Sequence, residues 1–293
     1  MSTVVMIETF VDLHCHSTAS DGSLSPAEVV ALAKRQGLSG LALTDHDTIA
    51  GITAAANTAA EMGIDFIAGI EISAEFSSPG TLHILGYGID PASPVLTALT
   101  EQLIAGRDNR NPQIIAKLNA LGMKITLAEV EAEAEGIVIG RPHIAAVLLR
   151  KGYVHTVKQA FDLYLAQGSA AYAEKERLTP RQAIEKIGQA GGLAVLAHPT
   201  QLRTSNPAEL ERVVKDLVDL GLAGIEVFHS DHSEANVTQF RSLAKRWNLL
   251  ETGGSDFHGR SKPTIGLGRA GKHRVPREMF DRLQEALSRV TTV

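Results

Sequence analysis

The feature that most constrains this chain is a strand-like apolar stretch that ends in metal-ligating side chains and recurs along the sequence. The first copy reads Phe10-Val11-Asp12-Leu13-His14-Cys15-His16-Ser17, with two histidines one residue apart. Alternate residues of a strand point to the same face, so both imidazoles can hold one ion. Later stretches end in the same manner at Thr44-Asp45-His46-Asp47, Gly69-Ile70-Glu71, Leu82-His83, Leu196-Ala197-His198-Pro199 and Gly254-Ser255-Asp256-Phe257-His258. This recurrence predicts one shared metal site.

The stretches alternate with helix signals, which predicts an α/β fold. Ser25 and Glu28 form a capping-box pattern around Pro26, as expected at a helix start. We expect strands from Phe10, at 38–44, 64–71, 80–87, 193–197 and 225–228, and before Gly253, with helices at 26–36, 49–62, 179–189, 207–220, 234–247 and 276–288. Such alternation indicates a parallel sheet closed or nearly closed into a barrel, with the site at the barrel mouth.

Residues 91–177 interrupt this alternation with helices alone, expected at 97–121, 127–135, 143–151 and 157–166. An all-helical segment inside an α/β chain is typical of an insertion over the barrel mouth, where loop elaborations carry specificity. We therefore predict a barrel formed by residues 1–90 and 178–293 and a helical lid formed by 91–177. At 293 residues with 44% hydrophobic content, the chain has the size of one elaborated α/β barrel.

Charge and cysteine content narrow the class of protein. The formal net charge of −5 gives no overall attraction to nucleic acid, which disfavours long polymer substrates. Cys15 is the only cysteine, so no internal disulfide can form, and we expect its thiol to point away from the histidines into the core. The N-terminal sequence lacks the basic region and long apolar run of a signal peptide. We expect a cytoplasmic, soluble protein without membrane contact, and the sequence leaves its oligomeric state open.

Several segments together resemble the polymerase and histidinol phosphatase (PHP) family of metal-dependent phosphoesterases. The segments, in the family's order over nearly the whole chain, are FVDLHCHSTASDGSLSP, LALTDHDT, GIEIS, LHILGYGID, GRPHIA, GGLAVLAHP, GIEVF and GSDFHG. The resemblance is greatest to the branch with a helical insertion, which includes nucleoside 3',5'-bisphosphate phosphatases and a 5'-to-3' exoribonuclease. It implies a distorted seven-stranded βα barrel that holds two or three divalent ions, commonly manganese, iron or zinc.

The resemblance also implies which residues hold the ions. The first ion would be held by His14, His16, Glu71 and Asp256. The second would be held by Asp21, His46 and His258, and the third by His83, His198 and a bridging Glu71. Every one of these positions carries a competent ligand. Asp21 departs from many family members, which have histidine there, and this departure bears on metal preference or on the occupancy of the second site.

The chemistry explains why such residues are needed. Mixed imidazole and carboxylate ligands suit Mn, Fe or Zn better than Mg, and we expect manganese, with iron or zinc as alternatives. Two ions about 3.5 to 4 Å apart can activate a water and stabilise the entering and leaving oxygens of a phosphoester. Catalysis is therefore assigned to a metal-bound water together with His198 and His258. We expect Asp45 and Asp47 to be hydrogen-bond partners of imidazole groups, or loop caps, rather than ligands.

Substrate contacts are expected from the insertion, in two clusters that each begin a helical stretch: Arg107 with Arg110, and Arg141 with His143. Arginine can bind phosphate through two parallel hydrogen bonds, and helix N–H groups assist. Alternatively, Arg107 and Arg110 are solvent-exposed charges on a helix. His143 could instead be a proton donor or a helix cap. Three more polar residues follow the expected strand at 225–228: His229, Asp231 and His232. We expect them to be exposed loop residues rather than part of a pocket lining.

Together these features predict a metal-dependent phosphomonoesterase that removes the 3'-phosphate of a nucleoside 3',5'-bisphosphate. One alternative is 5'-to-3' exonuclease action on short RNA, and a third is histidinol phosphatase activity. A metal-bearing regulatory module without turnover is disfavoured, because the ligand set is complete and no polymerase segment accompanies it in this sequence.

Overall fold

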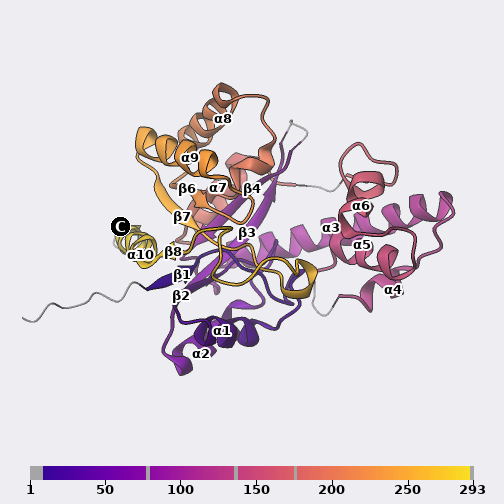
Figure 1. Ribbon diagram of the computed structural model, residues 1–293, viewed down its shortest axis with the longest axis horizontal. Helices are drawn as coiled ribbons and strands as arrows, with labels where there is room; N and C mark the ends of the chain where they lie inside the picture. The colour runs from indigo at the N-terminus through magenta and orange to yellow at the C-terminus, as the bar shows by residue number, and fades with distance from the viewer. Residues whose placement is uncertain (1–8, 77–79, 135–137, 175–176, 291–293) are drawn as a thin grey trace, which may run out of the picture.

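The computed structural model describes residues 9–76, 80–134, 138–174 and 177–290. Within these residues the strands form one eight-stranded sheet in the order β7-β6-β5-β4-β3-β2-β1-β8 (Figure 1). The strands are β1 Phe10–Asp12, β2 Leu38–Leu43, β3 Asp65–Ala74, β4 Leu82–Tyr87, β5 Leu193–Leu196, β6 Gly224–Phe228, β7 Leu250–Gly253 and β8 Val275–Pro276. The predicted α/β barrel fold is confirmed, and β8, a short strand antiparallel to β1, adds to the seven expected strands.

Hydrogen bonds between the segments that follow β1 and β7 nearly close the sheet into a barrel. The Leu13 N–H donates to the Gly253 carbonyl (N···O 3.2 Å), and the Asp256 N–H donates to the His14 carbonyl (2.8 Å). Farther along, the His16 N–H donates to the carbonyl of Phe257 (2.9 Å). This seam brings the first and the last candidate ligands of the chain side by side.

One strand departs from the predicted parallel arrangement. β1 to β3 are parallel, as are β5 to β7, but β4 is antiparallel to both β3 and β5. His83 is therefore the second residue of its strand, opposite Ser73 near the end of β3. Because β4 is reversed, its first residues lie at the same sheet edge as the carboxyl ends of its neighbours. The parallel prediction is wrong for this strand, and the reversal is what brings His83 to the barrel mouth.

Helices pack around the outside of the sheet: α1 Pro26–Arg35, α2 Ile52–Met62, α7 Pro180–Gln189, α8 Pro207–Asp219, α9 Glu234–Trp247 and α10 Arg277–Val290 (Figure 1). α1 begins as predicted, because the Glu28 N–H donates to Ser25 Oγ (3.3 Å) and the Ser25 N–H donates to the Glu28 carboxylate (2.8 Å). Strand residues such as Ile70, Leu85 and Val195 form the main core. None of the helices in the described ranges has the length and apolarity to cross a membrane.

The segment between β4 and α7 contributes only helices in its described residues, and we call it the helical insertion. Its helices are α3 Pro94–Ala120, α4 Leu127–Glu131, α5 Arg141–Arg150 and α6 Val157–Ala160, followed by a π-helical turn, η1 Phe161–Leu165. α4 ends before the predicted 127–135 helix does, and Glu135 lies outside the described residues. A second core that includes Ile114, Ile144 and Leu148 holds these helices together as a body beside the barrel (Figure 1).

Candidate metal centre

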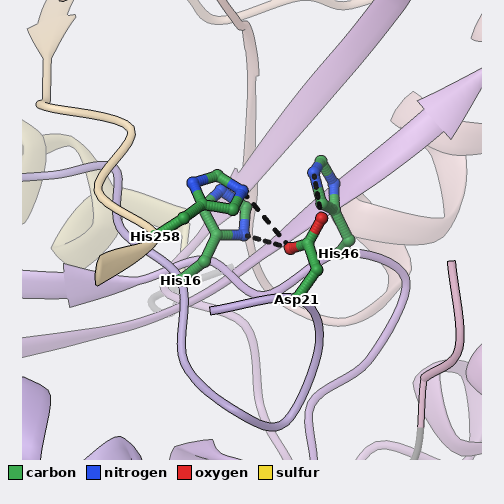
Figure 2. Close-up of side chains that lie close together, drawn as sticks. All are labelled: His16, Asp21, His46 and His258. Carbon is green, nitrogen blue, oxygen red and sulfur yellow. Dashed lines mark ion pairs between the residues drawn. The ribbon is translucent and has the colours of Figure 1, made fainter. Parts of the chain in front are cut away.

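The nine side chains predicted as ligands meet at the barrel mouth. They are His14 and His16 after β1, Asp21 in the loop beyond, His46 after β2, Glu71 in β3, His83 in β4, His198 after β5, and Asp256 and His258 after β7. Three groups of them, in each of which the ligand atoms lie within 4.8 Å of one another, are His16-Asp21-His46-His258, His14-Glu71-His198 and His46-Glu71-His83. His14 and Asp256 form a fourth such group with His229, which was not predicted as a ligand. Figure 2 shows the first group, in which three imidazoles approach the Asp21 carboxylate.

Glu71 lies at the centre of the cluster, fully buried, with imidazoles on both carboxylate oxygens. The rings nearest to Oε2 are His14 (Nε2, 3.3 Å), His16 (Nε2, 3.2 Å) and His46 (Nδ1, 3.0 Å). Oε1 lies 2.8 Å from His83 Nδ1 and 2.8 Å from His198 Nε2. Burial opposes the charged form, but His46 and His83 hold the pKa of Glu71 well below its usual range. An ionised carboxylate in this position can be shared between two neighbouring cations.

Several buried atoms of this cluster have no hydrogen-bond partner among the described residues. They are His14 Nε2, both ring nitrogens of His16, His46 Nδ1, Glu71 Oε2 and His198 Nδ1. An unsatisfied buried polar atom costs about 1–3 kcal/mol, so several of them gathered in one place favour a bound group there. Divalent cations bind both imidazole nitrogen and carboxylate oxygen, and this mixed donor set fits Mn, Fe or Zn.

Glu226 in β6 orients His14 and is a site residue that the sequence analysis missed. Its buried carboxylate lies 2.9 Å from His14 Nδ1 and accepts a hydrogen bond from the His198 N–H (2.7 Å). Burial opposes ionisation, but His14 and His229 lower the pKa of Glu226 to about 2. The carboxylate therefore receives the Nδ1–H of His14, which leaves Nε2 to face the cluster. The available signal was an acid within the apolar stretch Gly224-Ile225-Glu226-Val227-Phe228.

His258 is oriented by a backbone carbonyl. Its Nδ1 donates to the Asp256 carbonyl oxygen (2.9 Å), so Nε2 carries the lone pair and lies 3.3 Å from Asp21 Oδ1. Burial and the nearby Lys262 lower the pKa of His258 to about 4. Burial also lowers the pKa of His83 to about 4, against the opposite effect of the neighbouring carboxylate. Both imidazoles are therefore neutral near pH 7, which is the form in which histidine binds a metal.

The backbone is strained at three positions around the cluster. φ is 56° at Asp47, 24° at His198 and 57° at Asp256. Such conformations cost on the order of 1–3 kcal/mol in residues other than glycine, and they persist where the surrounding structure fixes them, often at functional sites. Two of the three are candidate ligands, so the strain coincides with the residues that form the cluster.

The aspartates on either side of His46 support loops. Asp45 accepts hydrogen bonds from the Ser17 N–H (2.7 Å), the Ser17 hydroxyl (2.7 Å) and the Ser20 hydroxyl (2.6 Å), and it thereby caps the loop that carries Asp21. Asp47 accepts from the Arg107 guanidinium, with Nη2 2.5 Å from Oδ2. The loop-cap interpretation of Asp45 therefore agrees with the structure, and Asp47 joins the barrel to the helical insertion.

Cys15, in the segment after β1, places its side chain in the core and not in the histidine cluster. Its fully buried thiol donates to the Ala42 carbonyl (3.2 Å) and packs with Val29 and Leu41. Burial raises the pKa of this thiol well above its usual range. The predicted core position is confirmed.

His229 and His232, after β6, are both buried, so the expected exposed loop position is wrong for them. The Asp231 N–H donates to His229 Nδ1 (3.1 Å), which places the ring hydrogen on Nε2, 3.3 Å from Asp256 Oδ2. His232 Nδ1 donates to the Val227 carbonyl (2.8 Å). Asp231 itself is exposed as expected, and it also lies in the lining of the cavity at the metal-ligand cluster. His229 therefore acts as a partner of a candidate ligand, because its remaining ring nitrogen carries a hydrogen.

A cavity of about 550 Å³ opens above the cluster. Four candidate ligands lie in its wall: Asp21, His46, His83 and His258. The segment 91–177 contributes four arginines to the lining, which we call the cavity arginines: Arg107, Arg110, Arg141 and Arg177. The cavity thus joins the metal-ligand cluster to a positively charged wall.

Two of the cavity arginines are buried, so the alternative of solvated helix charge is wrong for them: Arg107 is 8% and Arg110 3% exposed. Arg107 is paired with Asp47, whereas Arg110 donates only to the neutral side chain of Asn111 (3.0 Å) in the described residues. Burial, followed by repulsion from Arg107, Arg141 and Arg177, lowers the pKa of Arg110 to about 9. With a pKa of about 9 this guanidinium remains charged near pH 7, and no carboxylate in the described part of the chain forms an ion pair with it, which favours an anion in the cavity.

The second predicted cluster divides into a cavity residue and a helix cap. Arg141 donates to the Leu165 carbonyl (2.9 Å), and its guanidinium lies 5.7 Å from the Phe161 ring centroid. Burial and Arg177 lower its pKa to about 10. His143 Nδ1 accepts a hydrogen bond from the Gly140 N–H (3.0 Å), so His143 caps α5. The helix-cap alternative is thus the one that the geometry supports for His143.

Known proteins are similar to this chain in sequence and in fold. The PHP domain family matches residues 12–220. A 5'-3' exoribonuclease from Haemophilus influenzae is 40% identical over 247 residues, which cover 84% of this chain and 89% of the relative. A 3',5'-nucleoside bisphosphate phosphatase from Chromobacterium violaceum is 37% identical over 249 residues, which cover 85% of this chain and 87% of the relative.

The likeness extends to solved structures. A protein assigned as a metal-dependent phosphoesterase, from Bifidobacterium adolescentis, superposes with a TM-score of 0.84 at 30% identity. The superposition covers 94% of this chain and 95% of the other. With the sequence matches and the metal-ligand cluster at the barrel mouth, this shared fold shows that the chain belongs to the PHP domain family.

Proposed function

We propose that this chain removes the 3'-phosphate of nucleoside 3',5'-bisphosphates with the help of bound divalent ions. The observation that carries the proposal is that one cavity is lined both by metal-ligand side chains of the barrel and by arginines of the helical insertion. A nucleoside 3',5'-bisphosphate needs both elements, because charge develops at the reacting phosphoryl group and the second phosphate needs its own cation. The relative named as a 3',5'-nucleoside bisphosphate phosphatase supports this choice of substrate.

The predicted ligand sets are kept in this proposal, with manganese first and iron or zinc as alternatives. As the family resemblance implies, they are His14, His16, Glu71 and Asp256 for one ion, Asp21, His46 and His258 for another, and His83 and His198 with Glu71 for a third. Ions held there would lower the pKa of water and stabilise negative charge on the phosphoryl oxygens.

The protein's own residues then orient this chemistry. Glu226 holds His14 with Nε2 toward the cluster, and the Asp256 carbonyl does the same for His258. Of the two histidines assigned to catalysis, His258 lies in the cavity wall, whereas His198 lies beneath it against Glu71. In the proposal, His258 is therefore the one positioned next to the substrate.

The cavity size and charge fit a small nucleotide. Its volume of about 550 Å³ is within the range of small-molecule sites, about 300–1,000 Å³. Arg141 is our candidate for the contact with the non-reacting 5'-phosphate, because it lies in the wall contributed by the insertion and is not a neighbour of the ligands in sequence. Such a local, enclosed charge can select a doubly phosphorylated nucleotide although the whole chain is acidic.

A second candidate function is the stepwise removal of nucleotides from the 5' end of short RNA. An exposed cation favours it: Arg203 belongs to the lining of the same cavity and extends its charge toward solvent. The relative named as a 5'-3' exoribonuclease supports it as well. Both candidates share the metal centre and differ in how much of the substrate lies outside the cavity.

Arg141→Ala tests the substrate assignment. A charged hydrogen bond is worth about 1.5–3 kcal/mol, so kcat/KM for a nucleoside 3',5'-bisphosphate should fall roughly ten- to a hundredfold. The nucleoside 3'-monophosphate, which lacks the 5'-phosphate, should be hydrolysed nearly as by the wild type. Rates are measured for both substrates at saturating manganese, and metal content is measured alongside.

Arg150→Ala is the matched control, because Arg150 lies on the same helix with its side chain 52% exposed. An equal loss on both substrates would place Arg141 at the reacting phosphate or in the fold. Faster turnover of 5'-phosphorylated short RNA than of the bisphosphate by the wild type would select the exonuclease instead.

A further inference from the structure

We infer that Lys262 is a phosphate-binding residue. It belongs to the barrel, whereas the cavity arginines belong to the helical insertion. Lys262 follows the short 3-10 turn η3 (Gly259–Ser261), which begins directly after the candidate ligand His258. Its Nζ lies 2.5 Å from Asp256 Oδ2, and its side chain is 37% exposed and lines the cavity. Neither the sequence motifs nor the ligand assignment gives this residue a role.

The two oxygens of Asp256 are used differently, and this fixes where Lys262 points. Oδ1 faces the cluster, 3.3 Å from His16 Nε2 and 3.6 Å from His14 Nε2. Oδ2 faces away from those rings, toward His229 Nε2 (3.3 Å) and Lys262 Nζ. A metal held by Asp256 would therefore use Oδ1, while Oδ2 continues to hold the ammonium group at the edge of the cluster.

An ammonium group has three N–H donors, and the Asp256 carboxylate occupies one of them. Because Lys262 lines the cavity, donors remain available to a group inside it. Asp21 and His258 lie in the same cavity wall. A phosphate placed against the ions of these ligands would therefore come within reach of Lys262 as well.

Charge gives the physical reason for an anion at this place. A lysine beside two or three divalent cations is repelled by them, since like charges a few ångströms apart cost several kcal/mol in a partly buried site. Asp256 offsets this repulsion only in part once its charge is shared with a metal. A phosphate between the ions and the ammonium group converts the repulsion into attraction on both sides.

The inference rests on the proposed function, because a phosphoester hydrolase must bind the phosphate group that it releases. Inorganic phosphate is therefore the probe. Its dissociation constant is measured by calorimetry on manganese-loaded protein for the wild type, Lys262→Met and Lys262→Arg, together with metal content by elemental analysis. Lys272→Met is the matched control, because Lys272 is exposed in the same C-terminal region.

Lys262→Met should keep its metal and bind phosphate roughly ten- to a hundredfold more weakly, as expected for one charged hydrogen bond. Lys262→Arg should recover part of the affinity, and Lys272→Met should match the wild type. Loss of metal in Lys262→Met, with unchanged phosphate affinity in the molecules that retain it, would make Lys262 a support for Asp256 and overturn the inference. If Lys262→Met kept full metal content and bound phosphate as tightly as the wild type, the inference would also be overturned. If the wild type itself did not bind phosphate, both the inference and the proposed function would be wrong.

Discussion

At the residue scale, Glu226 offers a test of the metal centre that leaves the cavity wall intact. We expect Glu226→Gln to weaken manganese binding about ten- to a hundredfold, the usual effect of losing an outer hydrogen-bond partner of a ligand. The glutamine oxygen can still accept from His14 Nδ1, but its amide then faces the His198 N–H, and two donors oppose each other. Calorimetric titration of the metal-free protein with manganese measures the change.

Glu251→Gln is the control for this substitution, because Glu251 lies in the neighbouring strand β7 and pairs at the surface with Arg241 (3.3 Å). Exposed ion pairs contribute about 0–1 kcal/mol, so metal binding should not change. Unaltered manganese affinity in Glu226→Gln would mean that His14 is oriented by other contacts.

The residues that could be predicted from sequence are those whose role follows from position along one strand. His14, His16, His46, His198 and His258 each stand just beyond an apolar stretch, and all lie in the cluster. Other roles depend on hydrogen bonds between distant segments, which no local pattern displays. Glu226 serves a ring 212 positions away, and His229 serves Asp256 through its buried side chain.

At the scale of elements, the direction of β4 could have been predicted. The connection from β3 to β4 spans only 75–81, whereas a parallel pair needs a crossover of a dozen or more residues. The antiparallel pairing follows from this length. β8 carried no comparable signal, because a two-residue strand is defined by its pairing with β1 rather than by its own sequence.

Gly254 at the seam between the β1 and β7 segments provides the next prediction. A Cβ at this position would lie 2.3 Å from both the backbone nitrogen and the Cβ of His14, so alanine must push the two segments apart. We expect Gly254→Ala to lower the free energy of unfolding by about 1–3 kcal/mol and to weaken metal binding by displacing His14. Urea denaturation and manganese titration measure the two effects.

Gly188→Ala is the opposite control. Gly188 lies in α7 with open space where a Cβ would lie, and replacing a helical glycine by alanine stabilises a helix by about 0.5–1 kcal/mol. If Gly254→Ala were as stable as the wild type, the seam would be looser than the hydrogen bonds across it indicate.

At the scale of the whole molecule, a metal bound by residues from six strands should stabilise the barrel. A ligand at 100 times its Kd adds about 2.7 kcal/mol to the free energy of unfolding, which in a chain of this size raises Tm by about 5 °C. Calorimetry of the metal-free protein with and without manganese checks this expectation. His14→Ala should show no such shift, and an equal shift in that variant would place the stabilising metal elsewhere.

The barrel seam has a further consequence for when the metal can be bound. His14 and His16 are made well before Asp256 and His258, and the seam holds these two pairs together. An incomplete chain therefore presents scattered histidines, each a weak and unselective site, and folding of this barrel must wait for contacts between distant parts of the chain. The complete metal site can accordingly form only once the segment that carries Asp256 and His258 has been made and has paired with the segment of His14.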